Sequence, residues 1–311
     1  RPYLRHALTA ALSFSALTAL PASARMLCTI VADASDGRIL VQQGTQGDCT
    51  SRYTPASSFK LPIALMGFDA GILQDARTPT WPYESAYPDW GGEEWRKPAD
   101  PERWIKYSIV WYSQQVARRL GQKRFQQYAT AFQYGNEDVS GDAGKHNGLD
   151  GAWIVSSLRV SPLEQIGFLR KLVNRQLPIR PEVYGMVEPL FEIDPSREGW
   201  HVYGKTGTGS PGDNGRYDRE HAYGWFVGWA RKDGRQVVFA RLIQDEKATA
   251  PGAGLRARRA SWPRNTRPPG SAPTAPGPRP AARACAAGAA RSRSGACRAR
   301  GCSSGRRGPV K

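Results

Sequence analysis

Histidine is scarce in this chain of 311 residues, and the only four are His6, His146, His201 and His221. They are scattered, and neither they nor the five cysteines show the ligand spacing of a zinc site. After residue 24 the sequence also lacks an apolar run of the roughly 20 residues that a membrane-spanning helix needs. We therefore expect neither a metal ion nor a membrane anchor, and the 40% of hydrophobic residues is typical of a soluble globular protein.

Acidic residues are absent from Ser261 onward, where ten arginines and one lysine supply +11 of the net charge of +17. Such a basic segment is typical of nucleic-acid binding. It consists largely of Arg, Ala, Gly and Pro, however, whose codons can be written with G and C alone. We interpret residues 261–311 as a GC-rich gene read out of frame, and the alternative is a genuine disordered basic tail. We expect no nucleic-acid partner.

The first 24 residues have the features of an export signal. Arg1, Arg5 and His6 precede an apolar run from Ala7 to Leu20, and residues 22–24 have the small-x-small form that a signal peptidase accepts. We expect residues 1–24 to be removed and the mature protein to be periplasmic. Residues 25–260 then form one domain.

The stretch from Pro55 to Gly71 holds a serine and a lysine three residues apart, Ser57 and Lys60. On a helix, this spacing places the hydroxyl and the amine on one face. Lys60 lies among apolar residues such as Phe59 and Leu61, and burial lowers the pKa of a lysine toward a neutral amine that can activate a serine nucleophile. The alternative is a surface lysine beside an ordinary serine.

The distribution of strand and helix patterns predicts an α/β (α+β) fold. Apolar periodicity predicts helices over 109–120, 122–132 and 161–174, the last with a capping box from Ser161 to Glu164. Strands are predicted over 29–32, 38–42, 200–206, 223–230 and 236–243. These patterns imply one antiparallel sheet built from both chain ends, with a helical lobe inserted. In an oxidising compartment Cys28 and Cys49 could form a disulfide beside the first two strands, or remain two thiols.

Three further motifs follow Ser57, at separations of 51, 26 and 71 residues between successive motifs. Ser108, before Ile109 and Val110, could relay a proton between the lysine base and a leaving nitrogen. A helix is expected to close at Tyr134-Gly135-Asn136, where glycine suits the left-handed turn. In Lys205-Thr206-Gly207 the lysine and hydroxyl can bind a carboxylate, and the glycine lets a ligand approach the backbone.

In this order, the four motifs resemble those of class D β-lactamases, the oxacillinase group of the penicillin-recognising serine enzymes, over roughly Leu27 to Arg259. The resemblance implies a β-lactamase/transpeptidase-like fold and a small-molecule β-lactam substrate. It also implies that Ser57 is the nucleophile and that Lys60 is a general base carbamylated by CO2. The pocket that keeps water away from the carbamate would contain Val110, Trp153 and Phe59. Trp153 would form a hydrogen bond with the carbamate.

The resemblance also assigns the groups that bind substrate. The oxyanion hole would be the backbone N–H groups of Ser57 and Thr208. Lys205 and Thr206, with Arg256, would hold the substrate carboxylate. Trp111 is also assigned to substrate binding, and the loop geometry around Trp111 and Thr208 would influence the substrate spectrum. The enzyme would be a monomer or homodimer. The family's terminal helix is expected to be lost at its beginning, from about Arg259, which would lower stability.

Two other readings stay open at this point. The first is a penicillin-binding transpeptidase, carboxypeptidase or sensor on the same fold, which would be acylated but would release product slowly. The second is a basic interaction protein whose tail binds nucleic acid or an anionic membrane.

Overall fold

The computed structural model describes residues 24–197, 199–211, 216–248 and 252–259. The expected signal peptide, apart from its last residue, and the arginine-rich segment lie outside these residues. Within the described part of the chain, no helix is long and apolar enough to cross a membrane.

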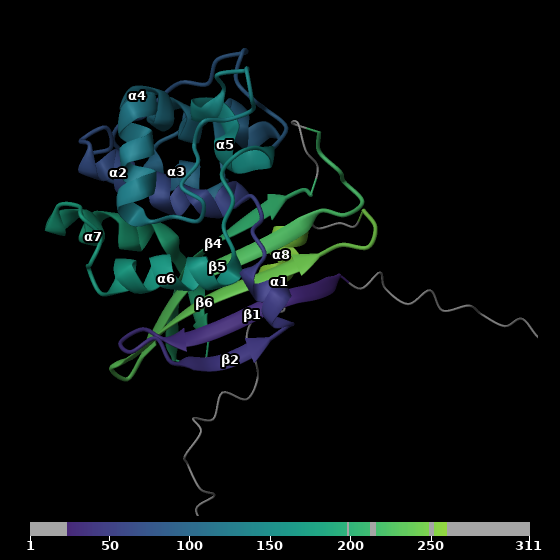
Figure 1. Ribbon diagram of the computed structural model, residues 1–311. Helices are drawn as coiled ribbons and strands as arrows, with labels where there is room; N and C mark the ends of the chain where they lie inside the picture. Colours follow the sequence, from purple (N-terminus) through teal and green to yellow (C-terminus); the bar gives the residue numbers. More distant parts are fainter. Residues whose placement is uncertain (1–23, 198, 212–215, 249–251, 260–311) are drawn as a thin grey trace, which may run out of the picture. The chain divides into compact units, whose positions relative to one another are not determined.

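A six-stranded sheet in the order β2-β1-β6-β5-β4-β3 forms the centre of the fold (Figure 1). Its strands are β1 (Arg25–Asp33), β2 (Ile39–Gln43), β3 (Glu192–Arg197), β4 (Trp200–Gly209), β5 (Tyr223–Lys232) and β6 (Arg235–Gln244). All neighbouring strands are antiparallel. Because β1 pairs with β6, the two ends of the domain share one sheet, which confirms the expected topology.

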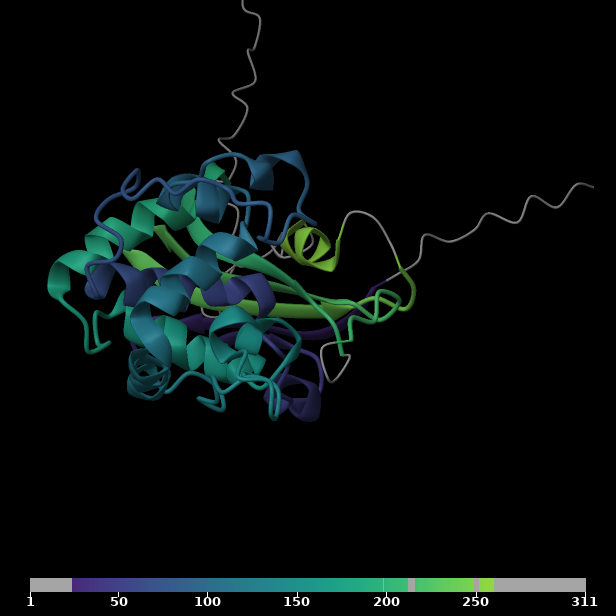
Figure 2. The same cartoon turned by 90° about the horizontal axis from the view of Figure 1, so that it is seen from above.

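The helices between β2 and β3 form a lobe on one side of this sheet (Figures 1 and 2). The α-helices of this stretch are α1 (Gln46–Thr50), α2 (Lys60–Asp69), α3 (Pro101–Lys106), α4 (Val110–Phe132), α5 (Gly148–Val155), α6 (Pro162–Val173) and α7 (Pro181–Val187), and the 3-10 helices are η1 (Ala56–Phe59), η2 (Glu93–Arg96) and η3 (Glu188–Phe191). Since side chains alternate along a strand, Trp225 and Val227 of β5 join the core beneath the lobe, while Phe226 packs on the opposite face.

Several predicted elements are confirmed with small changes of boundary. Element α4 contains the two helices predicted over 109–120 and 122–132, which are separated at Gly121, whose φ of 74° and ψ of 155° are not helical. Helix α6 has the predicted capping box between Ser161 and Glu164. Cys28 and Cys49 form a disulfide. It joins β1 to α1, the helix that follows the first hairpin, rather than bracing the hairpin itself.

The described domain ends in a helix that was not predicted from the sequence. Helix α8 runs from Ala253 to Arg259, and the expected loss of the family's terminal helix from about Arg259 stays a prediction. Ala257 of α8 packs with Phe226 on the face of the sheet opposite the lobe. The residues from 260 onward, where the expected frame change falls, lie outside the described part of the chain.

Candidate active site

Ser57 lies in η1, one short turn before α2. Pro62 is the third residue of α2, and the first turn of a helix tolerates proline. Ala56, which precedes Ser57, has a φ of 49°. A left-handed conformation of this kind costs a non-glycine residue about 1–3 kcal/mol and is common at functional sites. Contacts with neighbouring residues must therefore stabilise this turn.

Lys60 is fully buried, and its Nζ donates a hydrogen bond to Ser57 Oγ at 3.2 Å. Burial lowers the pKa of Lys60 well below the usual value for lysine, and the positive charge of Lys205 lowers it further. A neutral amine is therefore favoured beside the serine hydroxyl. At this distance the lone pair of the neutral amine can instead accept the hydroxyl proton, as a base for Ser57 requires.

A second serine–lysine pair faces the first. Ser108 lies between α3 and α4 with a φ of 56°. Its Oγ accepts a hydrogen bond from Lys205 Nζ at 3.1 Å, and Lys205 also donates to the carbonyl of Thr206. Burial lowers the pKa of Lys205 to about 7, with a smaller contribution from the charge of Arg258. Lys205 lies on β4, which packs on the turn that holds Ser57 at Gly207, so the two pairs belong to one site.

Strand β4 passes directly beside the nucleophile turn at Gly207. A Cβ added to Gly207 would lie 2.8 Å from the carbonyl oxygen of Pro55 and 3.3 Å from the backbone nitrogen of Ser57. Strand β3 pairs with β4 only as far as Tyr203. The stretch from Lys205 to Gly209 therefore pairs on its β5 side alone, and its other edge can offer backbone N–H groups to a ligand.

An aromatic cluster surrounds Phe59, the residue before Lys60. The ring of Phe59 lies 5.0 Å from Tyr134, 5.9 Å from Trp153 and 6.0 Å from Phe125, as centroid distances. Val110, Trp153 and Phe59, the three residues expected to line the carbamate pocket, are all buried. Trp153 Nε1 has no hydrogen-bond partner among the described residues. A buried donor without a partner is rare and indicates a place for an acceptor.

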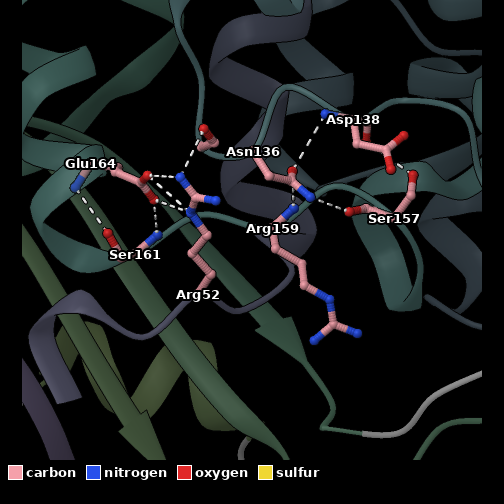
Figure 3. A network of polar contacts seen from close by, with 8 residues as sticks. Arg52, Asn136, Asp138, Ser157, Arg159, Ser161 and Glu164 are labelled. Carbon is pink, nitrogen blue, oxygen red and sulfur yellow. Dashed lines mark hydrogen bonds and ion pairs between the residues drawn. The ribbon is translucent and has the colours of Figure 1, made fainter. Parts of the chain in front are cut away.

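The Tyr134-Gly135-Asn136 segment has a structural position. Gly135 has a φ of 60°, and a Cβ there would lie 2.1 Å from the carbonyl oxygen of Arg159. Asn136 donates to the carbonyl of Ser157 and accepts from the backbone nitrogen of Arg159, both at 2.8 Å (Figure 3). These contacts hold the loop after α4 against the segment between α5 and α6.

Trp111, which was assigned to substrate binding, has no exposed surface with which to contact a substrate. Its side chain is fully buried, and its Nε1 donates to the carbonyl of Trp95 at 2.8 Å. Trp111 also stacks on Tyr87. Trp111 can therefore affect substrate binding only through the residues that cover it. The spacing of residues in the sequence did not predict where those covering residues lie.

Arg256 lies on α8 and forms an ion pair with the buried Asp245, just after β6. The backbone nitrogen of Gly254 donates to Thr208 Oγ1 at 3.0 Å, which holds the start of α8 beside β4. Asp245 was missed by sequence analysis, because nothing in the local pattern distinguishes it from other polar residues at the end of a strand. The ion pair means that Arg256 is already oriented by a carboxylate.

Comparisons with known proteins agree with this geometry. Residues 27–261 match the family model of the penicillin binding protein transpeptidase domain. The chain is 48% identical to beta-lactamase OXA-9 of Klebsiella pneumoniae over 233 residues, which cover 74% of this chain and 84% of that protein. It is 32% identical to beta-lactamase OXA-1 of Escherichia coli over 75% of this chain and 81% of that protein.

Among solved structures, the class D β-lactamase OXA-427 superposes with a TM-score of 0.69 at 44% identity, covering 75% of this chain and 93% of that one. The site geometry, the fold and these relatives point to one assignment. The chain belongs to the class D serine β-lactamases, which are built on the transpeptidase fold of the penicillin-binding proteins.

Proposed function

We propose that this class D β-lactamase opens the β-lactam ring by forming an acyl-enzyme on Ser57 and that Lys60 supplies the base. One observation carries the proposal, namely the 3.2 Å contact of Ser57 Oγ with the amine of a lysine that is fully buried. Lysine is almost never fully buried in an apolar core unless it has a partner or a chemical role there.

In acylation, Ser57 Oγ would bond to the lactam carbonyl carbon while its proton leaves toward the Lys60 side chain. The carbon–nitrogen bond of the ring then breaks, and the nitrogen receives a proton through Ser108, which Lys205 contacts. The backbone N–H groups of Ser57 and Thr208 would bind the developing oxyanion, supported by the close packing of Gly207 on the nucleophile turn. Water then hydrolyses the ester and restores Ser57.

The surroundings of Lys60 fit a carboxylated lysine. CO2 reacts with a neutral amine, and burial favours that form of Lys60. Trp153 would donate its unpartnered Nε1–H to the modified side chain, and Val110 and Phe59 would keep water away. Carboxylation would give Lys60 an oxygen that acts as general base in acylation and in hydrolysis of the acyl-enzyme.

The test of this function compares hydrolysis of a chromogenic cephalosporin and a penicillin in degassed buffer and with added bicarbonate. The wild type should gain activity with bicarbonate, and mass spectrometry should detect a transient adduct on Ser57. In Trp153→Phe the bicarbonate needed for half-maximal activity should rise about 10- to 100-fold, since a hydrogen bond to a charged group contributes about 1.5–3 kcal/mol.

Trp104→Phe is the matched control for the indole. Trp104 is equally buried, but its Nε1 donates to Ser113 Oγ at 2.8 Å. This variant should lose stability without changing the bicarbonate requirement. An unchanged requirement in Trp153→Phe, or turnover in the wild type that is indifferent to bicarbonate, would contradict the carboxylated lysine.

Lys205 and Thr206, together with Arg256, would bind the substrate carboxylate. Since the pKa of Lys205 is lowered to about 7, its positive charge is lost as the pH rises above that value. We expect KM for an anionic penicillin to increase above pH 7, approaching about tenfold for each pH unit. Lys205→Arg keeps the charge at high pH, so a KM in this variant that rises as steeply as in the wild type would exclude the assignment.

Export of the enzyme to the periplasm is part of the proposal. The Cys28–Cys49 disulfide supports it, because disulfides persist in oxidising compartments. In the periplasm the enzyme would meet its small-molecule substrate as a monomer or homodimer.

A further inference from the structure

The first turn of α6 lies between the nucleophile turn and the Tyr134-Gly135-Asn136 segment. Two adjacent residues of this turn, Glu164 and Gln165, make side-chain contacts on both sides of Ser57. Neither contact is needed to form α6, since its start is already fixed by the Ser161 cap.

Glu164 binds the segment before the nucleophile. Its two carboxylate oxygens accept hydrogen bonds from Arg52 Nε at 3.0 and 3.1 Å (Figure 3). The other end of the Arg52 guanidinium lies 3.5 Å from the carbonyl of Gly135. This ion pair is partly exposed to solvent, and exposed pairs contribute little to stability.

Gln165 contacts the residue after the nucleophile. Its Nε2 donates to Tyr134 Oη at 2.9 Å and lies 3.4 Å from Ser58 Oγ. Ser58 Oγ in turn donates to the carbonyl of Pro55 at 2.6 Å. The side chains of Tyr134, Gln165 and Ser58 are all buried, so a continuous run of hydrogen bonds leads from α6 to the turn that holds Ser57.

The turn is thus held from two directions. Gly207 of β4 packs against the carbonyl of Pro55 and the backbone nitrogens of Ser57 and Ser58. Ser58 receives the side chain of Gln165 from the lobe. A buried amide is costly unless its hydrogen bonds are satisfied, and an apolar residue of the same size would fill the space without that cost.

We propose that Gln165 is a positioning residue for acylation, which acts through Ser58 to fix the orientation of the Ser57 hydroxyl and backbone N–H. The inference rests on the proposed role of Ser57 as nucleophile. It predicts that losing the amide slows the chemical step more than it weakens substrate binding, because small displacements of a reacting group can reduce rates on the order of 100-fold.

The experiment measures the acylation rate and the substrate dissociation constant by stopped flow in Gln165→Met, Ser58→Ala and the double variant. Gln165→Met should acylate about 10- to 100-fold more slowly with an unchanged dissociation constant. If Gln165 acts through Ser58, the two substitutions remove the same interaction with the nucleophile turn. The double variant should then acylate little more slowly than the slower single variant.

Ser113→Ala is the control, because it removes a buried hydrogen bond with Trp104 away from the nucleophile turn. It should change the melting temperature but not the acylation rate. If Gln165→Met does not fold, Tyr134→Phe removes only the hydroxyl at the other end of the Gln165 contact and should also slow acylation.

Acylation at the wild-type rate in the folded Gln165 or Tyr134 variant, or strictly multiplicative effects of Gln165→Met and Ser58→Ala, would overturn the positioning role. The wild-type adduct on Ser57 is measured in the same assay. Its absence would contradict the proposed function itself, so the two failures are distinguishable.

Discussion

Ser57→Ala is expected to reduce kcat for penicillin hydrolysis by a factor on the order of 10⁴ to 10⁶. The substitution removes the only oxygen that contacts the amine of Lys60 among the described residues. Binding should survive, because the groups proposed to hold the substrate carboxylate lie on β4 and α8. The rate is measured by single-turnover hydrolysis, and the adduct by mass spectrometry of the intact protein.

Ser51→Ala provides the control for this prediction. Ser51 is exposed, and its hydroxyl donates to the carbonyl of Gly47 in α1, away from the site. Normal turnover and a normal adduct are expected there. A Ser57→Ala protein that keeps more than about a tenth of the activity would require another nucleophile, since a nucleophile's removal typically costs far more.

Lys60→Met is expected to lower activity and raise stability together. Loss of the base should slow acylation and hydrolysis of the acyl-enzyme by at least about 10² to 10⁴. Lys60 is buried and its pKa is lowered in the folded state. In the unfolded chain the lysine binds a proton below pH about 10.4, so the folded state is penalised progressively as the pH falls from that value toward the folded pKa.

Methionine has a similar length and no charge, and therefore removes this penalty. In degassed buffer, where Lys60 is not carboxylated, the melting temperature of Lys60→Met should exceed that of the wild type at pH 7, and the difference should disappear above about pH 10.5. Lys123→Met is the control, since it removes an exposed lysine from α4. A Lys60→Met protein that melts below the wild type at pH 7 would mean that the amine stabilises the fold, contrary to the assignment of a neutral base.

The parts of the site that sequence analysis predicted depend on local geometry. Ser57 and Lys60 come together because three residues of helical chain determine their distance. The cap of α6 is local in the same way. That one sheet is built from both chain ends followed from the strand patterns there, because strands of this kind must pair with one another to bury one face. The order of its strands and the edge strand β3 were not predicted.

The parts that were missed depend on contacts between distant segments. Trp111 is covered by Tyr87, which lies in an irregular loop, and by Trp95 of the short 3-10 helix η2, and neither segment has a periodic signal in the sequence. The hydrogen bond of Gln165 with Ser58 spans 107 residues. In the sequence Gln165 is one polar residue in an amphipathic helix, and only the tertiary packing shows that it is buried against the nucleophile turn.

The pairing of β1 with β6 has a consequence for the order of events during synthesis. Strand β1 pairs with β2, which is close to it in the sequence. It also forms a longer ladder with β6, whose residues are synthesised more than 200 positions later. Folds dominated by such separations have high contact order and fold slowly. Ser57 and Lys205 therefore cannot form one site until nearly the whole domain has left the ribosome. The central sheet of this topology is therefore completed only when the last strand of the domain has been synthesised.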